Sequence, residues 1–328
     1  MIITRRRLAA GSAGLLAAPA LLRPAAAQGT LEWVAGALGG GWYTIATGMS
    51  QIVTEANPSI RISVVPGGGV ANPTRVQNGV SQLGFGLDFL VSSAIKGEEP
   101  YKEKHDKVTH LGVGWSPTEH HFLRRTDAGP TDMKAILTMP GLRLGTLPVS
   151  ASDTLTLVRI LSYYGTGFDK IRAEGGRVVF GSYNDLAAAF SDNQVDYVYF
   201  ALAKPAAVLT EMARGRRPLA LVAFPQDLRD HLTQAYGFSQ GVIPAATYPG
   251  VQTADVPVTT MDTVLLAAAG IPEPIAYAIV KSLIDARPRL ATIHPSVAAF
   301  DPTKACRYPG APIHPGAKRA FAEAGCTI

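Results

Sequence analysis

The sequence predicts an α/β fold of two units, each a mostly parallel sheet with helices on its faces. Three observations lead to this prediction. Apolar runs of strand length alternate with apolar residues at helical spacing, and loops rich in glycine or serine follow the strands. The alternation stops once, near residues 120–125, and then resumes. Repeats of strand, loop and helix are typical of doubly wound parallel sheets.

The first set of alternating elements covers the N-terminal third of the chain. We expect strands at residues 31–37, 60–65 and 83–87. The helix after the first strand carries Ile45, Met49 and Ile52 at helical spacing. A second helix is expected around residues 72–80, and a third follows Asp88.

The second set begins after an interruption. Strands are expected at residues 142–146, 178–180, 195–202 and 219–223, with helices at 155–164, 184–190 and up to 214. Residues 120–125 are predicted to be a first crossover strand, and the Pro/Gly-rich residues 243–257 the return. A strand at 258–267 and helices at 273–285 and from 316 complete the chain. We therefore divide it into residues 28–120 with 249–328 (lobe I) and residues 121–248 (lobe II), with hinges near 120–125 and 243–248.

The N-terminus has the features of a secretory signal. Arginines at 5–7 precede an Ala/Gly/Leu stretch at 8–22, and three alanines at 25–27 precede Gln28. We expect residues 1–27 to be cleaved before Gln28 and the mature chain to be periplasmic. The paired arginines favour the twin-arginine route, and a Sec signal that carries three arginines is the alternative. The apolar run is shorter than the roughly 20 residues that a membrane-spanning helix needs.

The charge excludes a nucleic-acid binder. The 328 residues carry 30 Lys and Arg against 25 Asp and Glu, a net charge of +5. Four of these arginines, at 5, 6, 7 and 23, belong to the expected signal, which leaves 26 basic residues and a net charge of +1. A basic surface for phosphates is therefore not expected.

Motifs for catalysis and cofactors are missing. The sequence contains no GxxxxGK[ST], HExxH or GxSxG. The glycines at 36, 39 and 41 have the wrong spacing for a dinucleotide fingerprint, and no acidic residue lies in the strand at 60–65. His120 and His121 are adjacent, so in a strand they point to opposite faces and do not converge on a metal. We expect no catalytic residue, no cofactor and no metal.

The two cysteines, Cys306 and Cys326, lie near the C-terminus. In an oxidising periplasm they can form a disulfide that closes a loop of roughly 20 residues and contributes about 3 kcal/mol. The alternative is two separate buried thiols. The sequence leaves both open.

Polar and glycine residues follow several expected strands, where ligands bind in open α/β sheets. Glycine lets backbone N–H groups approach a carboxylate, and a helix N-terminus favours an anion. Lys204 is the best single charge partner, and Asp88 either receives an ammonium or hydroxyl group or caps its helix. Aromatic residues supply walls for the cleft between the two sheets. The candidate ligand-binding residues are Gly40, Gly41, Trp42, Tyr43, Thr44, Gly68, Gly69, Asn72, Asp88, Ser150, Ser152, Asp153, Thr154, Lys204 and Tyr248.

Four stretches resemble one family in the same order along the chain. Residues 39–48 (GGGWYTIATG) resemble its GGTYYxxG signature, and residues 66–72 resemble its TGGSxEN loop. Residues 246–257 are similar to its GTYPGxxxDVP crossover, and residues 314–317 match its closing HPGA. The family is that of the TAXI solute receptors, the extracytoplasmic binding proteins of TRAP transporters.

The resemblance implies a two-lobed type II periplasmic binding protein. Such a receptor captures a small organic solute, a carboxylate or an amino acid, and delivers it to a TRAP membrane permease. We expect a monomer without enzymatic activity. Alternatives are the binding component of an ABC importer, a periplasmic sensor of the same fold and, less favoured, a transferase-like enzyme. The chain departs from the family at residues 86–89, 150–153 and 203–205, which leaves the solute open.

Overall fold

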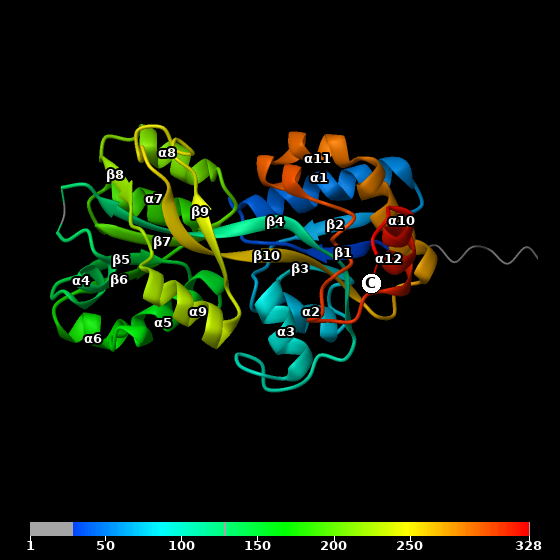
Figure 1. The fold of residues 1–328 in the computed structure, drawn as a ribbon, viewed down its shortest axis with the longest axis horizontal. Coiled ribbons are helices and arrows are strands. Elements are labelled where there is room, and N and C mark those ends of the chain that lie inside the picture. The colour runs from blue at the N-terminus through cyan, green and yellow to red at the C-terminus, as the bar shows by residue number, and fades with distance from the viewer. Residues whose placement is uncertain (1–28, 128, 328) are drawn as a thin grey trace, which may run out of the picture.

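Two long antiparallel strands, β4 (Val108–Arg125) and β10 (Val256–Ala268), run through both halves of the molecule (Figure 1). They appear in a computed structural model that describes residues 29–127 and 129–327. Helices gather around each end of this strand pair, so the molecule has two lobes. The two-lobed α/β fold is thereby confirmed. The predicted signal peptide lies outside the described residues.

Lobe I contains three parallel strands in the order β2-β1-β3, next to the N-terminal part of β4 and the C-terminal part of β10. Its strands are β1 (Leu31–Val34), β2 (Ile62–Val65) and β3 (Leu83–Leu87). Its helices are α1 (Gly41–Ala56), α2 (Asn72–Gln77), α3 (Asp88–Lys96), α10 (Glu273–Asp285), α11 (Arg287–Ile293), the 3-10 helix η1 (Pro295–Ala299) and α12 (Pro315–Glu323).

Lobe II repeats the arrangement with the parallel order β7-β5-β6. Its strands are β5 (Arg143–Thr146), β6 (Arg177–Phe180), β7 (Tyr197–Leu202), β8 (Leu219–Leu221) and β9 (Ser239–Ile243). Its helices are α4 (Met133–Thr138), α5 (Ser152–Tyr163), α6 (Phe168–Ala173), α7 (Tyr183–Ser191), α8 (Ala207–Arg214) and α9 (Gln226–Tyr236).

The sheets of the two lobes, which we expect to be separate, are joined in one hydrogen-bonded path, β2-β1-β3-β10-β4-β7-β5-β6. The reason is the length of β4, which has 18 residues and pairs with β10 at one end and with β7 and β8 at the other. The pairing of β4 with β10 contains register shifts between Asp262 and Val264 and between Val264 and Leu266. Such irregularities bend a strand pair and increase its twist, and here they lie in lobe I, where β10 also pairs with β3.

The return from lobe II to lobe I takes place in β10, after the stretch in which we expect it. Residues 239–243 form β9, which pairs with β10 inside lobe II, and residues 244–255 form the connection between them. The hinges near residues 120–125 and 243–248 and the domain boundaries stay predictions.

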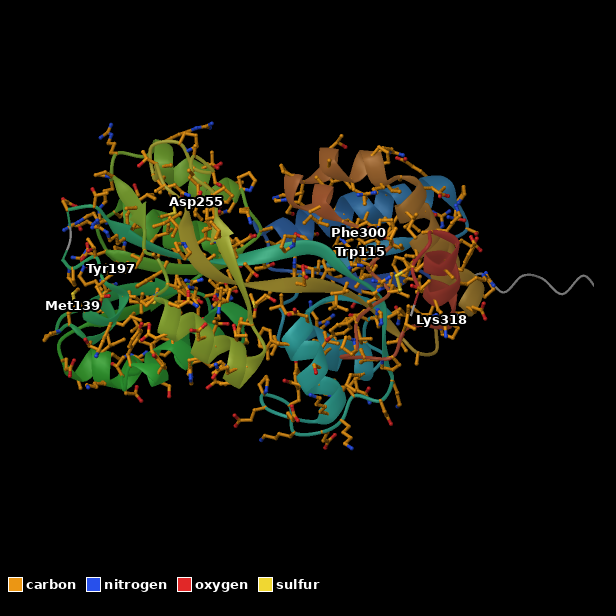
Figure 2. The ribbon with its side chains drawn as sticks, viewed as in Figure 1. Trp115, Met139, Tyr197, Asp255, Phe300 and Lys318 are labelled. Atoms are coloured by element: carbon orange, nitrogen blue, oxygen red, sulfur yellow. A yellow bond between two sulfur atoms is a disulfide. The ribbon has the colours of Figure 1, made fainter. Side chains whose placement is uncertain are left out.

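Each lobe has its own hydrophobic core. In lobe I, Trp115 stacks on Phe300 with ring centroids 3.8 Å apart (Figure 2). The core of lobe II is built around β5 and β7 and includes the buried Tyr197, which lies close to Met139 in Figure 2. Burying large aromatic side chains in two clusters stabilises each lobe through its own packing.

Cys306 and Cys326 form a disulfide, with Cα atoms 6.2 Å apart. Of the two possibilities that the sequence leaves open, the structure shows the bridge. It ties the segment before α12 to the residues that follow this helix. The expected effect is a smaller loss of C-terminal order on heating, since the bridge restrains the unfolded chain.

Candidate functional site

The strand ends of the two lobes meet around a small cavity, which we call the inner cavity. It holds about 70 Å³ of free space. A buried water occupies on the order of 10–15 Å³ of such space, so the cavity has room for a handful of water-sized groups. Its lining consists of Gly36, Ala37, Gly40, Gly41, Trp42, Gly67, Gly68, Gly69, Leu87, Thr118, Leu147, Ala151, Ser152, Asp153, Tyr183, Ala201, Leu202 and Ala203.

On the lobe I side, helix α1 begins at the cavity. Its N-cap residue, Gly40, makes no side-chain capping hydrogen bond, and no acidic residue lies in the first turn. The first N–H groups of a helix have no partner within the helix. The N-terminus of α1 therefore presents backbone donors and a partial positive charge to the cavity.

The loop of residues 67–69 forms a second part of the lobe I wall. A Cβ on Gly67 would lie 2.4 Å from Oδ1 of Asn72 and 2.4 Å from a methyl group of Val34. Only glycine fits at this position, because both neighbours are buried. A Cβ on Gly68 would meet nothing within 4 Å, which shows that this residue faces open space.

The side chain of Asn72 holds this loop in place by hydrogen bonds. Its Oδ1 accepts from the N–H of Gly68 at 2.9 Å, and its Nδ2 donates to the carbonyls of Ala35 at 2.6 Å and Phe85 at 2.7 Å. The side chain is fully buried and uses its amide on three backbone groups. Asn72 thus positions the wall and lies outside the lining.

On the lobe II side, helix α5 begins at the cavity, after the loop of residues 147–151 that follows β5. Its N-cap residue, Ala151, also makes no side-chain capping hydrogen bond. Ser152 and Asp153 are the first residues of the helix and line the cavity. A Cβ on Gly69 would lie 3.0 Å from Oγ of Ser152, so the two lobes approach closely here.

Asp153 is buried and holds the end of β7. Its Oδ1 accepts from the N–H of Ala201 at 2.7 Å and from the hydroxyl of Tyr183 at 3.2 Å. Burial raises the pKa of the Asp153 carboxyl to about 6, although the bond from Ala201 opposes the rise. A carboxyl with this pKa is still mostly ionised at pH 7, and its charge is partly offset by the N–H of Ala201 and the hydroxyl of Tyr183.

Trp42 closes one side of the cavity. Its indole N–H donates to Oγ1 of Thr263 at 2.9 Å, and its ring lies 5.5 Å from that of Phe85. These contacts fix the ring as an apolar wall, because its single donor is already used.

The structure brings seven of the candidate residues together in the lining. These are Gly40, Gly41, Trp42, Gly68, Gly69, Ser152 and Asp153. Three others support the lining or lie beside it on the same helix: Asn72, Tyr43 and Thr44. Thr154 is buried and donates to the carbonyl of Leu147, and Ser150 is exposed.

Lys204 lies outside the lining. Its ammonium forms an ion pair with Glu119, a residue of β4 that is 1 % exposed. Burial raises the pKa of Glu119 while the pairing with Lys204 opposes the rise. The lysine compensates a buried carboxylate, so we leave it out of the site that we propose.

Tyr248 is fully buried behind the crossover strands and also lies outside the lining. Its hydroxyl accepts from the N–H of Ala206 at 2.9 Å and bonds Nε2 of His121 at 2.9 Å. Both bonds tie the loop after β9 to lobe II. The side chain is part of the core of lobe II and packs there.

Asp88 begins α3 and lines a different, larger cavity of about 920 Å³, which we call the outer cavity. Its Oδ1 accepts from the N–H of Phe89 at 2.8 Å, at the first turn of the helix. Burial raises the pKa of the Asp88 carboxyl to about 7.

Sequence reasoning missed eleven lining residues. Most of them lie at or just after the carboxyl ends of strands, as the candidates do. The expectation that ligands bind at these ends could therefore have identified them. Tyr183 is an example, because it is the first residue of α7, a helix whose start after β6 is marked by a Ser182–Asp185 capping box. Thr118, in the middle of β4, gives no such signal.

None of the residues that line the inner cavity is Lys, Arg or His. Among residues 29–127 and 129–327, no group of three or more His, Cys, Asp or Glu side chains is placed to hold a metal ion. His120 and His121 bond different tyrosines, Tyr199 and Tyr248. Within the same residues, no helix has the length and apolar character needed to cross a membrane.

The fold is similar to that of several solved proteins. The malate-bound protein MatC from Rhodopseudomonas palustris has a TM-score of 0.54 and 16% identity, and the match covers 90% of this chain and 97% of MatC. The periplasmic binding protein BugD has a TM-score of 0.53 and 13% identity, with coverage of 90% and 93%. A structure described as a periplasmic transporter has a TM-score of 0.51 and 14% identity, with coverage of 90% and 95%.

The sequence itself matches one family over nearly its whole length, because residues 34–325 match the NMT1-like family. The chain belongs to the NMT1-like family and has the two-lobed fold of periplasmic solute-binding proteins.

Proposed function

We propose that the protein is a periplasmic receptor that captures a small organic anion in the inner cavity and delivers it to a TRAP membrane permease of the TAXI type. One observation carries this proposal. The N-termini of α1 and α5, from different lobes, both lack a side-chain cap and open onto the same cavity. A solute held by both helices would bind both lobes at once.

The anionic class follows from the charges of the lining. Each helix N-terminus carries roughly half a positive charge, and its free N–H groups suit carboxylate oxygens. No side-chain cation lines the cavity, so recognition is left to the backbone. The small volume favours a short solute. Because MatC was solved with malate, short carboxylates such as malate are the first candidates.

The TAXI assignment is supported by the four sequence stretches that resemble this family, in particular the glycine loop before α1. A gene for a large TRAP membrane subunit next to the gene of this protein would support it, and genes for an ABC importer would contradict it. Export is part of the proposal. Protein recovered from the periplasm should begin at Gln28.

The receptor is proposed to return its solute unchanged. Asp153, the one acidic residue of the lining, is already engaged by the N–H of Ala201 and the hydroxyl of Tyr183. Incubation with the bound solute followed by mass spectrometry should recover the solute at its original mass. A new mass that grows with time would contradict a receptor.

The test begins with native mass spectrometry of protein purified from its own periplasm, followed by a thermal-shift screen of short carboxylates, malate first, and amino acids. A solute that binds only the folded protein raises the melting temperature by mass action. The identified solute is then titrated against two variants.

Gly68→Leu and Gly270→Leu form a matched pair, since neither glycine has an atom within 4 Å of its Cβ position and neither has a left-handed φ. Gly68 lines the inner cavity and Gly270 does not. We expect Gly68→Leu to lower the affinity by about 100-fold or more, because the new side chain takes the space of the solute. Gly270→Leu should bind as the wild type does. Equal binding by both variants would place the solute elsewhere.

A further inference from the structure

The outer cavity lies between α3 of lobe I and helices α5 and α9 of lobe II, at the lower side of the molecule in Figure 1. With about 920 Å³ it is far larger than the inner cavity, and it is also more open to solvent. It has the size of cavities that hold small-molecule ligands. The proposed function assigns it no role.

Arg159, in the middle of α5, is the central cation of this cavity. Its guanidinium carbon lies 4.1 Å from the ring centroid of Tyr236, 5.2 Å from that of Phe89 and 5.9 Å from that of Phe238. Aromatic rings over a guanidinium hold its plane in place by cation–π attraction. The rings cover its faces and contribute no acceptor for its donors.

Within the described part of the chain Arg159 has no carboxylate at ion-pair distance, although the charge of Glu99 at the rim favours its charged form. No carboxylate forms an ion pair with it, and its Nη1 is buried without a hydrogen-bond partner. Burial lowers the pKa of Arg159, which shows that its charge is disfavoured where it lies. Leaving a partly buried cation unpaired is unfavourable. A bound anion would relieve this cost.

Asp88 lies on the other lobe and lines the same cavity. One of its oxygens accepts from the N–H of Phe89, and no lysine or arginine among the described residues forms an ion pair with it. Burial raises the pKa of its carboxyl to about 7, and nearby Asp262 adds to the rise. A cationic group next to Asp88 would favour its ionised form.

The rest of the lining suits a short polar molecule. Ser92 and Ser93 of α3 and Ser162 of α5 supply hydroxyl groups, while Leu155 and Val158 supply apolar surface. Lys96, Glu98 and Glu99 are exposed at the rim, where water screens their charges. Arg159 and Asp88, the basic and the acidic side chain inside the cavity that form no ion pair with another described residue, therefore set its preference.

We propose that the outer cavity is a second ligand site, which binds an extended zwitterion whose carboxylate pairs with Arg159 and whose ammonium pairs with Asp88. A planar guanidinium forms two parallel hydrogen bonds to a carboxylate. Because Arg159 belongs to lobe II and Asp88 to lobe I, the bound zwitterion connects the lobes. This site goes beyond the anion site of the inner cavity and does not depend on it.

The probes are ω-amino acids of increasing length, from glycine through 4-aminobutanoate to 6-aminohexanoate, with butanoate and butylamine as singly charged controls. Isothermal titration of the full mature chain measures each affinity. At least one zwitterion of the series should bind about 10-fold or more tightly than butanoate and butylamine, since each charge-assisted contact contributes a factor of this order. Failure of every zwitterion to exceed the singly charged controls would overturn the proposal.

Single substitutions test which residue contacts the carboxylate of the zwitterion and which contacts its ammonium. Arg159→Gln should weaken binding of the zwitterion and of butanoate by about 10-fold and leave butylamine binding unchanged. Asp88→Asn should weaken binding of the zwitterion and of butylamine by about 10-fold and leave butanoate binding unchanged. Arg172→Gln, an exposed arginine on α6, and Asp192→Asn, an exposed aspartate after α7, should leave all affinities unchanged. Gly68→Leu should leave zwitterion binding within about twofold. Loss of zwitterion binding in Gly68→Leu but not in Arg159→Gln would place the zwitterion in the inner cavity and overturn the second site.

Discussion

The inner and outer cavities lie between the same two lobes and are built in different ways. The inner cavity is lined by glycine and alanine at the ends of strands, and its donors are backbone N–H groups at the starts of α1 and α5. The outer cavity is lined by side chains on the surfaces of helices, with Arg159 and Asp88 as its inner charges.

The two kinds of cavity wall should therefore respond differently to amino-acid substitution. A wall of backbone groups depends on buried side chains that hold the loops, such as Asn72 and Asp153. Changing those side chains disturbs the fold itself. A wall of helix side chains can change its charges while the helices stay in place, so its specificity is the easier of the two to alter.

Asn72→Ala tests the first half of the comparison and should have the largest effect. It leaves the N–H of Gly68 and the carbonyls of Ala35 and Phe85 without their partner in a buried site. We expect a loss of about 3 kcal/mol in the free energy of unfolding, measured by urea denaturation. Asn78→Ala, at an exposed position just after α2, should change it by less than about 0.5 kcal/mol. Equal stabilities for the two variants would mean that Asn72 does not hold the loop.

Lys204→Ala tests whether the inner cavity lacks a side-chain cation. Removing the ammonium leaves Glu119 buried without its partner, so the free energy of unfolding should fall by about 2 kcal/mol. Affinity for the identified anion should stay within about twofold of the wild type, with Lys170→Ala on α6 as an exposed control. A loss of affinity of about 10-fold or more, with little change in stability, would show that the cavity recognises anions through a lysine after all.

The sequence predicts the inner cavity better than the outer one because the two follow different rules. Strand ends and glycine loops are visible as runs of neighbouring residues, and they lead to Gly40, Gly68 and Ser152 without any knowledge of distant contacts. The succession of strands and helices along the chain and the two lobes follow from the same alternation. The continuity of the sheet does not, since it depends on the pairing of β4 with β10.

Partners far apart in sequence explain the candidates that lie outside the lining. Lys204 follows a strand as predicted, but its ammonium forms an ion pair with Glu119, 85 residues before it. Tyr248 bonds His121, 127 residues away. Arg159 lies in the middle of a helix and is surrounded by rings from α3 and from the segment around residue 236. No spacing in the sequence marks such a set.

The pH dependence of stability tests the burial of Asp88 in the outer cavity. Its carboxyl has a pKa of about 7 in the folded protein against 3.8 ordinarily. The folded protein thus keeps a proton that the unfolded chain loses between these values. Its contribution to stability is present below about pH 4 and is lost as the pH rises through about 7.

Asp88→Asn removes this dependence. Relative to the wild type, the variant should gain on the order of 1–3 kcal/mol of unfolding free energy between pH 4 and pH 8. The neighbouring groups are Asp262, whose pKa burial also raises, and Tyr308, whose hydroxyl donates to the Asp88 carbonyl. Tyr308 is unchanged in the variant, whereas Asp262 no longer faces the charge of Asp88, which adds to the gain of the variant at high pH. Urea denaturation at several pH values measures it, with Asp192→Asn as the exposed control. A difference that does not vary with pH would place Asp88 in contact with solvent.

Arg159→Gln should have the smallest effect on stability, and this makes it the sharpest test of the comparison. The substitution loses the cation–π contacts with Tyr236 and Phe89, which contribute on the order of 1 kcal/mol. It also removes an unpaired, partly buried charge, which acts in the opposite direction. The free energy of unfolding should therefore change by less than about 1 kcal/mol in the absence of ligand, as it should for Arg172→Gln on the exposed face of α6. A loss as large as that expected for Asn72→Ala would mean that the guanidinium holds α5 against α9 as a structural element. Changing a side chain of the outer cavity would then destabilise the fold as much as changing a residue that holds the backbone wall of the inner cavity.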